Sequence, residues 1–365
     1  MTGRHIQESI ADLEKRLTSG QIDRDGALDL AAAYRLEGRL QDAAEMLAKL
    51  LERPDPDWEI CRACVECYRE ADLMEEAVEI LNRWAARFRD RAEFWMLRGL
   101  MLELMGEWKA ALREHDLACQ IAPHMAEAQY RHGIVLMQLG RYDEARVDFV
   151  KALKLRPNFA RAQMNIGLLY EAQGNVRDAI GAFEQALRLD PQNADAHLNL
   201  GALYGEAGDS QRALEHCEKA LELDPTSSEA AYNAGLALSD RDPDQAIRFL
   251  RRAIASNPEN VDAYHRLGVI AQARGRWEIA AGFFEKAVER DPERMDSLFA
   301  LAVCYGKSDR AKEAVAAFRK LLDHDPCNEK AWFYLGVAYD KLGDSEQAGA
   351  AYRKADEAAA GRIDG

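Results

Sequence analysis

A proline recurs through this chain at an almost constant interval. The seven residues are Pro123, Pro157, Pro191, Pro225, Pro258, Pro292 and Pro326, at steps of 34, 34, 34, 33, 34 and 34 residues. Glycines and alanines recur in the same step: Gly99, Gly133, Gly167, Gly201, Gly235 and Gly268, and Ala111, Ala145, Ala179, Ala213, Ala246 and Ala280. Spacing this regular indicates one repeated structural element of about 34 residues, so we predict a continuous array of like repeats.

The repeat that begins at Ala160 shows what each element contains. Apolar residues recur with helical spacing up to Gly174, and a second run with the same spacing ends at Pro191. Glycine directly after a helix and proline just beyond one are typical stops. Each repeat is therefore predicted to be a helical hairpin, and the chain is predicted to be all-α.

The residue types at fixed positions of the repeat resemble those of the tetratricopeptide repeat family. The pattern has an apolar or aromatic residue at position 4, Leu-Gly at 7 and 8, Tyr at 11, Ala at 20 and 27, Phe or Tyr at 24, and Pro at 32. The last repeat shows most of it, in Trp332, Leu335, Gly336, Tyr339, Ala348, Tyr352 and Ala355. The resemblance covers nearly the whole chain and implies a right-handed α-solenoid (superhelix) of about ten helical hairpins. It does not imply one partner, because this fold serves many unrelated ones.

In this register ten repeats form a solenoid from residue 24 to residue 362. We expect them near residues 24–57, 58–91, 92–125, 126–159, 160–193, 194–227, 228–260, 261–294, 295–328 and 329–362. The repeat 228–260 is one residue short and its turn lacks the glycine, but Asp242 can cap the next helix and Pro243 can begin it. Residues 363–365 are expected to be a tail.

Residues 1–23 precede the first repeat. Ile6, Ile10, Leu13 and Leu17 form an apolar stripe with helical spacing. We predict an N-terminal capping helix that covers the open face of the first hairpin. The alternative is an amphipathic segment that docks into a groove of this chain or of another copy. Docking into another copy would make the protein a homo-oligomeric structural scaffold.

Charge and motifs argue against several classes of protein. The formal net charge is −15, so the molecule as a whole repels nucleic acids, and we expect no nucleic-acid partner. The amino terminus lacks the apolar core of a signal peptide and no window is apolar enough to span a bilayer, so we expect a cytoplasmic protein without membrane insertion. No phosphate loop, metalloprotease motif or nucleophile elbow occurs in the sequence. We therefore expect neither an enzyme nor a bound cofactor.

Three cysteines in the second repeat have the spacing of a possible metal site. Cys61, Cys64 and Cys67 occupy positions that hold core residues in other repeats. On one helix they spread over an arc of about 120°, so three sulfur atoms do not readily converge on a tetrahedral ion. We expect small buried side chains here and no metal; a metal or redox protein is the less favoured alternative.

The family resemblance places position 6 of each first helix on the inner, concave surface. In five consecutive repeats this position holds Arg131, Asn165, Asn199, Asn233 and Arg266. An asparagine side chain offers both a donor and an acceptor, so it can pair with the backbone of a bound peptide. The series resembles the asparagine ladder by which some tetratricopeptide repeat proteins hold extended peptides. The alternative is that asparagine stands at this position for structural reasons.

The residues beside this ladder are mostly apolar. Position 5 of the same repeats holds Tyr130, Met164, Leu198, Tyr232 and His265, which favours a ligand with apolar side chains or self-association. Position 2 is acidic in eight of ten repeats, which we attribute to the favourable place of an acid in the first turn of a helix. We predict a non-catalytic scaffold or adaptor that binds an extended, partly apolar segment of another protein. A carboxylate clamp for chaperone tails is not expected, because position 5 is never lysine and position 9 is never asparagine.

Overall fold

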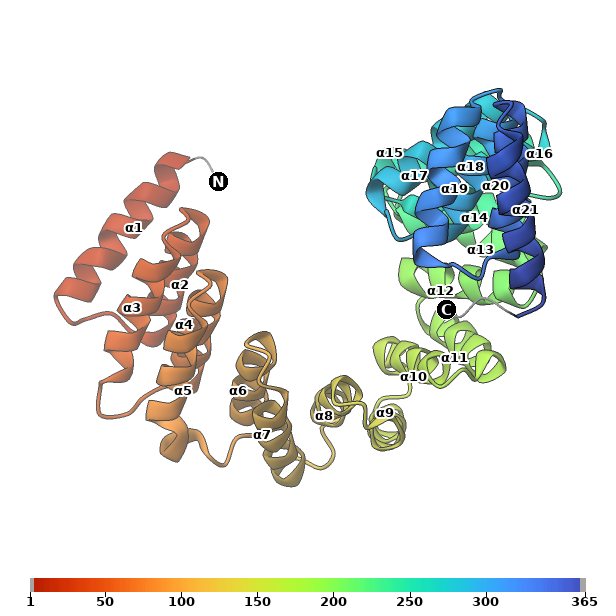
Figure 1. The fold of residues 1–365 in the computed structure, drawn as a ribbon. Helices are drawn as coiled ribbons and strands as arrows, with labels where there is room; N and C mark the ends of the chain where they lie inside the picture. Colours follow the sequence, from red (N-terminus) through yellow and green to blue (C-terminus); the bar gives the residue numbers. More distant parts are fainter. Residues whose placement is uncertain (1–2, 362–365) are drawn as a thin grey trace. The chain divides into compact units, whose positions relative to one another are not determined.

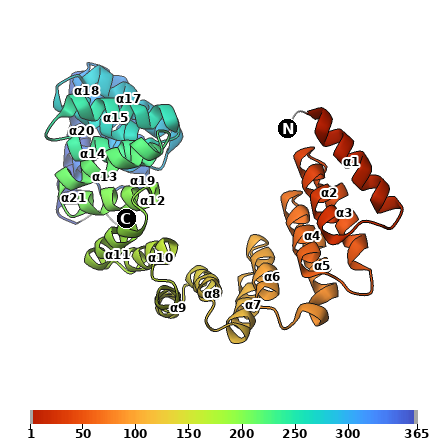
Figure 2. The same cartoon turned by 180° about the vertical axis from the view of Figure 1, so that it is seen from behind.

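The computed structural model describes the backbone of residues 3–361 and the side chains of residues 10–361. This range contains 21 α-helices and no strand, so the all-α prediction is confirmed (Figures 1 and 2). The helices are α1 (Gly3–Thr18), α2 (Arg24–Leu36), α3 (Leu40–Leu51), α4 (Trp58–Glu70), α5 (Met74–Phe88), α6 (Ala92–Leu104), α7 (Trp108–Ile121), α8 (Ala126–Gln138), α9 (Tyr142–Leu155), α10 (Ala160–Ala172), α11 (Val176–Leu189), α12 (Ala194–Glu206), α13 (Ser210–Leu223), α14 (Ser228–Leu238), α15 (Pro243–Ser256), α16 (Val261–Ala273), α17 (Trp277–Arg290), α18 (Met295–Lys307), α19 (Ala311–His324), α20 (Glu329–Lys341) and α21 (Ser345–Ala359).

The helices pair as hairpins within two compact units. The first unit, Met1–Leu189, contains α1 to α11, and the second, Asp190–Gly365, contains α12 to α21. Within each unit, each even-numbered helix from α2 onward packs on the odd-numbered helix after it, and most hairpins also pack on the next. This is the repeated packing of a helical solenoid. The boundaries predicted for the ten repeats, and their continuity from one unit to the other, stay predictions.

The turns inside the hairpins form where the sequence supplies the residues they need. Gly174, between α10 and α11, has a φ of 73°, a conformation that favours glycine. In the short repeat, the Asp242 carboxylate accepts a hydrogen bond from the Gln245 backbone N–H at 3.0 Å, and Pro243 is the first residue of α15. A side-chain cap and a proline therefore begin this helix where a glycine turn is missing.

Glycine at position 8 lets the two helices of a hairpin approach each other closely. A Cβ atom added at Gly167 would come 2.5 Å from the Phe183 ring, which lies sixteen residues further on and is fully buried. Gly133 has the same relation to Phe149. In these two hairpins the aromatic ring of the second helix therefore fills the space that the glycine leaves in the first, whereas beside Gly201 and Gly235 the side chains of Cys217 and Leu250 do so.

The second repeat departs from this arrangement. Val65 replaces the glycine and is fully buried, and the residue sixteen positions later is Leu81, which is also fully buried. Trp84, at a position where alanine is usual, is only partly buried at the edge of this core, and its indole N–H is buried without a hydrogen-bond partner. An aliphatic pair thus replaces the glycine and aromatic pair in this hairpin.

Helix α1 packs against α2 of its own chain. Ile10 and Leu13 are buried, and Leu17 packs on the same core. The side chain of Ile6 lies outside the described residues, so the predicted apolar stripe is seen over three of its four members. The contact with α2 agrees with a cap, although that role stays a prediction.

A buried carboxylate links α8 to α9 in the first unit. Asp148 lies 2.6 Å from Nδ1 of His132 and accepts a hydrogen bond from Nζ of Lys151 at 2.8 Å. Burial is the largest single influence and raises the pKa of Asp148, but the hydrogen bonds and charges of the two basic residues together outweigh it. The pKa of this carboxyl is therefore lowered, which favours its charged form.

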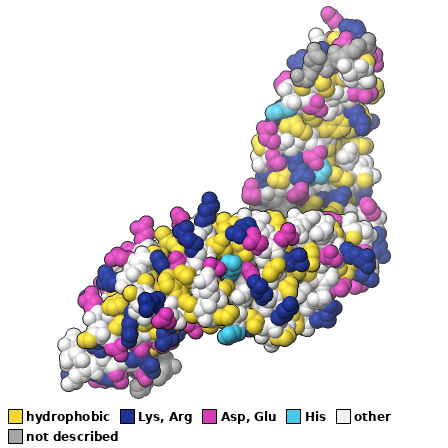
Figure 3. All heavy atoms as spheres, turned by 90° about the horizontal axis from the view of Figure 1, so that it is seen from below, with side chains coloured by type: hydrophobic (Ala, Val, Ile, Leu, Met, Phe, Trp, Pro, Cys, Tyr) yellow, Lys and Arg dark blue, Asp and Glu magenta, His cyan; other side chains and the backbone are white. Residues whose placement is uncertain are grey.

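Within residues 3–361, none of the helices combines the length and the apolar character that a membrane span requires. On the face visible in Figure 3, acidic and basic side chains lie interspersed with apolar ones.

Candidate protein-binding surface

The ten candidate residues all lie on first helices of hairpins, four in the first unit and six in the second. They are Tyr130 and Arg131 on α8, Met164 and Asn165 on α10, Leu198 and Asn199 on α12, Tyr232 and Asn233 on α14, and His265 and Arg266 on α16. Because the two units are separate bodies, the geometry of each group is described by itself.

In the first unit the asparagine of the predicted ladder is bound within the chain. The Asn165 side-chain N–H groups donate to the Tyr130 hydroxyl at 3.1 Å and to the Arg161 backbone carbonyl at 2.9 Å. Asn165 is 8% exposed. Both of its donors are therefore used inside the chain, one to join α10 to α8 and one within α10, and its oxygen is the group left to meet a partner.

The Tyr130 ring packs against two aromatic rings and one guanidinium group. Its centroid lies 4.8 Å from that of Phe159 and 5.7 Å from that of Phe149, and the Arg161 guanidinium carbon lies 5.3 Å from the ring centre. Burial raises the pKa of Tyr130, and nearby positive charge partly offsets this. Met164 is buried as well. The apolar candidates of the first unit are thus largely core residues.

Three arginines surround one carboxylate in the same region. Glu127 lies 3.5 Å from Arg131, 3.7 Å from Arg156 and 3.5 Å from Arg161. The cluster carries a surplus of positive charge, and Arg156 and Arg161 are exposed. Sequence reasoning found only Arg131 as a site residue. A signal for Arg161 was present, because it breaks the acidic pattern at position 2.

In the second unit two asparagines of the predicted ladder keep their side chains available. Asn199 and Asn233 are half-buried. Neither carboxamide forms a hydrogen bond with another residue in the described part of the chain. Helices α12 and α14 that carry them contact each other. The acceptor that binds Asn165 is a tyrosine 35 residues earlier, whereas at that offset before Asn233 stands Leu198, which has no polar group.

Tyr232 and Arg266 lie close enough to influence each other. Burial raises the pKa of Tyr232, Asp262 raises it further, and the positive charges of Arg266 and Arg294 lower it. Arg266 forms no ion pair with any other described residue, whereas Arg294 pairs with Asp262 at 2.6 Å. Tyr232 also lines a cavity of about 530 Å³ at the amino-terminal ends of α14 and α16.

His265, on α16, contacts two residues of α18. Its Nδ1 lies 2.8 Å from the Ser297 hydroxyl, and its Nε2 lies 3.7 Å from the Asp296 carboxylate. The ring packs edge-on against Phe284. Burial lowers the pKa of His265, although the charge of Asp296 opposes this. Its main contacts are therefore internal.

Comparison with known families accounts for the repeated geometry. Three family models described as tetratricopeptide repeat match residues 27–101 and 206–267, residues 124–192, and residues 166–228. The chain belongs to the tetratricopeptide repeat family. A model of the middle TPR-like domain of cilia and flagella-associated protein 70 matches residues 239–359. No curated protein matches the chain.

Several solved structures are similar to parts of this tetratricopeptide repeat protein. The C-terminal part of a TPR repeat-containing protein from Cytophaga hutchinsonii is 16% identical, with a TM-score of 0.53, and the match covers 65% of this chain and 98% of that one. YrrB, described as a TPR protein with an unusual peptide-binding site, is 25% identical over 48% of this chain and 92% of its own, with a TM-score of 0.46. MamA is 32% identical over 47% of this chain and 94% of its own, with a TM-score of 0.42.

The cysteines of this tetratricopeptide repeat protein that resemble a metal motif lie in its core. Cys61, Cys64 and Cys67 are buried, and the Cys64 thiol donates to the Ala44 carbonyl at 3.3 Å. Burial raises the pKa of Cys61 to about 12 and that of Cys67 to about 11. The thiolate form that binds metals is therefore disfavoured at neutral pH. Among the described residues, no group of three potential ligands could hold a metal ion.

Proposed function

We propose that this protein is a non-catalytic scaffold that binds an extended, partly apolar segment of a partner protein through the first helices of its hairpins. The repeat fold is typical of protein-interaction scaffolds. The observation that carries the proposal is that Asn199 and Asn233, on neighbouring first helices of the second unit, have carboxamides without a partner among the described residues. The partner would meet the protein in the cytoplasm, the location expected from the sequence.

The two amides suit a peptide backbone. Each can donate to a backbone carbonyl and accept from a backbone N–H, whatever the side chains of the bound segment are. Leu198 and Tyr232 stand directly beside them and would contact apolar side chains, while Arg266 would bind a carbonyl or an acidic group at one end. His265 lies beside Arg266 and would add an apolar face.

In the first unit the contribution would differ, because Asn165 is already bonded inside the chain. Its oxygen remains an acceptor, and Arg131 adds a positive charge next to it. Tyr130 and Met164 are buried and would act mainly by holding these two groups in place. The arginines around Glu127 favour an acidic residue in a segment that binds to this unit.

Substitution of the two available asparagines tests the proposal. If each amide contributes on the order of 1 kcal/mol, Asn199→Ala together with Asn233→Ala weakens partner binding about thirtyfold. The assay is a pull-down from cell extract with quantitative mass spectrometry, followed by affinity measurement on the recovered partner. Gln192→Ala is the matched control, because it removes an exposed amide from a turn of the same unit. Equal recovery by wild type and double variant would show that these amides are not the binding groups.

A further inference from the structure

A tyrosine at position 11 uses its hydroxyl in a defined way in the first hairpin. The Tyr34 hydroxyl donates to the Glu14 carboxylate at 2.7 Å, and Glu14 is the residue twenty positions earlier. Arg39, five positions later, stacks on the tyrosine with its guanidinium carbon 4.0 Å from the ring centre and lies 3.8 Å from the same carboxylate. The carboxylate thus accepts a hydrogen bond from the tyrosine and lies within ion-pair distance of the arginine.

The hairpin of α18 and α19 repeats the arrangement. The Tyr305 hydroxyl donates to the Glu285 carboxylate at 2.8 Å, again twenty positions earlier. Arg310, five positions later, lies 3.1 Å from that carboxylate and 4.2 Å from the centre of the tyrosine ring. The same group of tyrosine, glutamate and arginine therefore forms in both units, each time with the glutamate on the helix that precedes the hairpin.

The last hairpin has the tyrosine too, but a basic residue stands at the place of the glutamate and an acidic residue at the place of the arginine. Arg319 stands twenty positions before Tyr339, and Asp344 stands five positions after it. Tyr339 is 7% exposed, and its hydroxyl is buried without a hydrogen-bond partner. Asp344 does not supply the acceptor, because its carboxylate caps α21 by accepting from the Gln347 backbone N–H at 3.1 Å.

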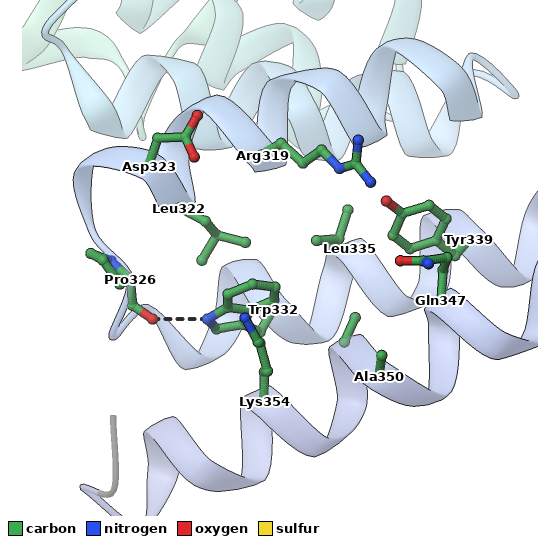
Figure 4. A pocket seen from close by; sticks show the side chains of 11 residues that line it. Arg319, Leu322, Asp323, Pro326, Trp332, Leu335, Tyr339, Gln347, Ala350 and Lys354 are labelled. Carbon is green, nitrogen blue, oxygen red and sulfur yellow. Dashed lines mark hydrogen bonds between the residues drawn. The ribbon is translucent and has the colours of Figure 1, made fainter. Parts of the chain in front are cut away.

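Arg319 lacks a counterion as well. Its guanidinium carbon lies 5.7 Å from the centre of the Tyr339 ring, and it forms no ion pair with any residue that the structure describes. In Figure 4 the Tyr339 hydroxyl is directed toward this guanidinium. Two donors therefore face each other where Tyr34 and Tyr305 meet a carboxylate, and an unsatisfied buried hydroxyl is costly.

A cavity opens at this point between α19, α20 and α21. Its volume is about 390 Å³, which lies within the range of about 300–1,000 Å³ typical of small-ligand sites. Leu322 and Leu335 line it from one side. Trp332 lines it from another, with its indole N–H donating to the Pro326 carbonyl at 2.8 Å and the Lys354 ammonium 4.5 Å from its ring centre.

The charge of this cavity favours an anion. Its lining contains Arg319 and Lys354 against one acid, Asp323, which Figure 4 shows at the end away from the Arg319 guanidinium. The cavity thus carries a surplus positive charge in a chain whose formal net charge is −15. Its apolar side suits a carboxylate that is attached to an apolar group.

We propose that this cavity of the last hairpin binds a carboxylate from another molecule, which accepts hydrogen bonds from the Arg319 guanidinium and the Tyr339 hydroxyl. The ligand carboxylate takes the place that Glu14 occupies beside Tyr34 and Glu285 occupies beside Tyr305. A carboxylate is favoured over other anions because that is the group found at this place in the same chain. The site uses positions 4, 7 and 11 of α20, so it is separate from the asparagine surface proposed above.

Binding requires a movement of one exposed side chain. The Tyr339 oxygen has almost no accessible surface, so a carboxylate reaches it when the guanidinium of Arg319 turns aside and pairs with the incoming group. Arg319 is exposed and held only by its contact with the tyrosine ring. The movement therefore breaks no hydrogen bond or ion pair with a residue that the structure describes.

Three small probes and nuclear magnetic resonance of the full chain test the site. N-acetyl-leucine presents a terminal carboxylate, N-acetyl-leucine amide presents none, and N-acetyl-glutamic acid α-amide presents a side-chain carboxylate. The readout is the indole N–H signal of Trp332, assigned by comparison with Trp332→Phe. We expect a saturable shift with one or both carboxylates and none with the leucine amide. The two carboxylates distinguish a chain terminus from an acidic side chain as the natural source.

Two variants connect any shift to the proposed atoms. Arg319→Glu places the chain's own carboxylate beside Tyr339, as in the other hairpins, and should abolish probe binding while leaving the thermal midpoint unchanged or higher. Tyr339→Phe removes only the hydroxyl and should weaken binding about tenfold. If Arg319→Glu does not fold, Tyr339→Phe still decides the matter. Undiminished binding in the folded variants, equal shifts with acid and amide, or no shift in the wild type would each overturn the site without bearing on Asn199 and Asn233.

Discussion

Replacing Gly167 with alanine tests how tightly α10 and α11 are packed. The added methyl group would lie 2.5 Å from Cε1 and 2.6 Å from Cδ1 of Phe183, well inside the usual contact distance of about 3.5–4.0 Å. Phe183 is fully buried, so its ring has no solvent space to enter. Overpacking typically costs about 1–3 kcal/mol, more than the roughly 1 kcal/mol that alanine gains over glycine in a helix. We expect Gly167→Ala to lower the free energy of opening of this hairpin by up to about 2 kcal/mol.

The matched control lies in the same hairpin. A Cβ atom at Gly181, in α11, would meet no atom within 4 Å, so Gly181→Ala should instead stabilise the hairpin by about 0.5–1 kcal/mol. Hydrogen exchange of peptides from α10 and α11, followed by mass spectrometry, measures both changes. It reports local opening, which suits an array of repeats better than one global transition does.

A second substitution should reverse the first. In Gly167→Ala/Phe183→Leu the shorter side chain leaves room for the methyl group, as the pair of Val65 and Leu81 does in the second repeat, and protection should partly return. If Gly167→Ala protects α10 and α11 as well as Gly181→Ala does, the ring is not confined and the packing argument is wrong.

Three further outcomes follow from individual contacts. Asn165→Ala should lower the free energy of unfolding by about 1 kcal/mol, because it removes two internal hydrogen bonds, whereas Asn233→Ala should cost much less; equal denaturation midpoints would contradict this difference. Asp148 has a lowered pKa in the folded protein, so its contribution to stability is complete above the unfolded-state pKa of about 3.9 and is lost as pH falls toward the folded-state pKa. Asp148→Asn should therefore destabilise the protein at pH 7 and reduce the slope of stability against pH in acid. Iodoacetamide at pH 8 should modify exposed Cys327 and leave buried Cys61 unmodified in the folded protein, which peptide mass spectrometry would detect.

The sequence was sufficient to predict the fold because the residues that end each helix lie within its own hairpin. In most repeats glycine ends the first helix and proline follows the second, and the glycine at position 8 marks where a side chain of the partner helix must fit. Even the short repeat was predictable, because Asp242 and Pro243 are a cap and a helix start whatever surrounds them. These signals are local, so they survive without knowledge of the neighbouring repeats.

The candidate site was less predictable because it depends on pairs of residues from different repeats. Asn165 and Asn233 occupy the same position, yet only Asn165 meets a hydroxyl, since Tyr130 precedes it by 35 residues where Leu198 precedes Asn233. Comparing each asparagine with the residue 35 positions earlier would have distinguished Asn165 from Asn233. The relation between Tyr339 and Arg319 was equally hard to predict. The residue twenty positions before a tyrosine is informative only once the structure shows that Glu14 and Glu285 bond to Tyr34 and Tyr305 at this offset.

The recurring tyrosine has a consequence for the order of the hairpins. The Glu285 carboxylate that satisfies Tyr305 belongs to the preceding hairpin, so each such tyrosine depends on its upstream neighbour. Duplicating, deleting or shuffling whole hairpins, by recombination or by design, would separate donor from acceptor at every new junction of this kind. Hairpins of nearly equal length are therefore not interchangeable, because side-chain contacts between neighbouring hairpins help to specify their order along the chain.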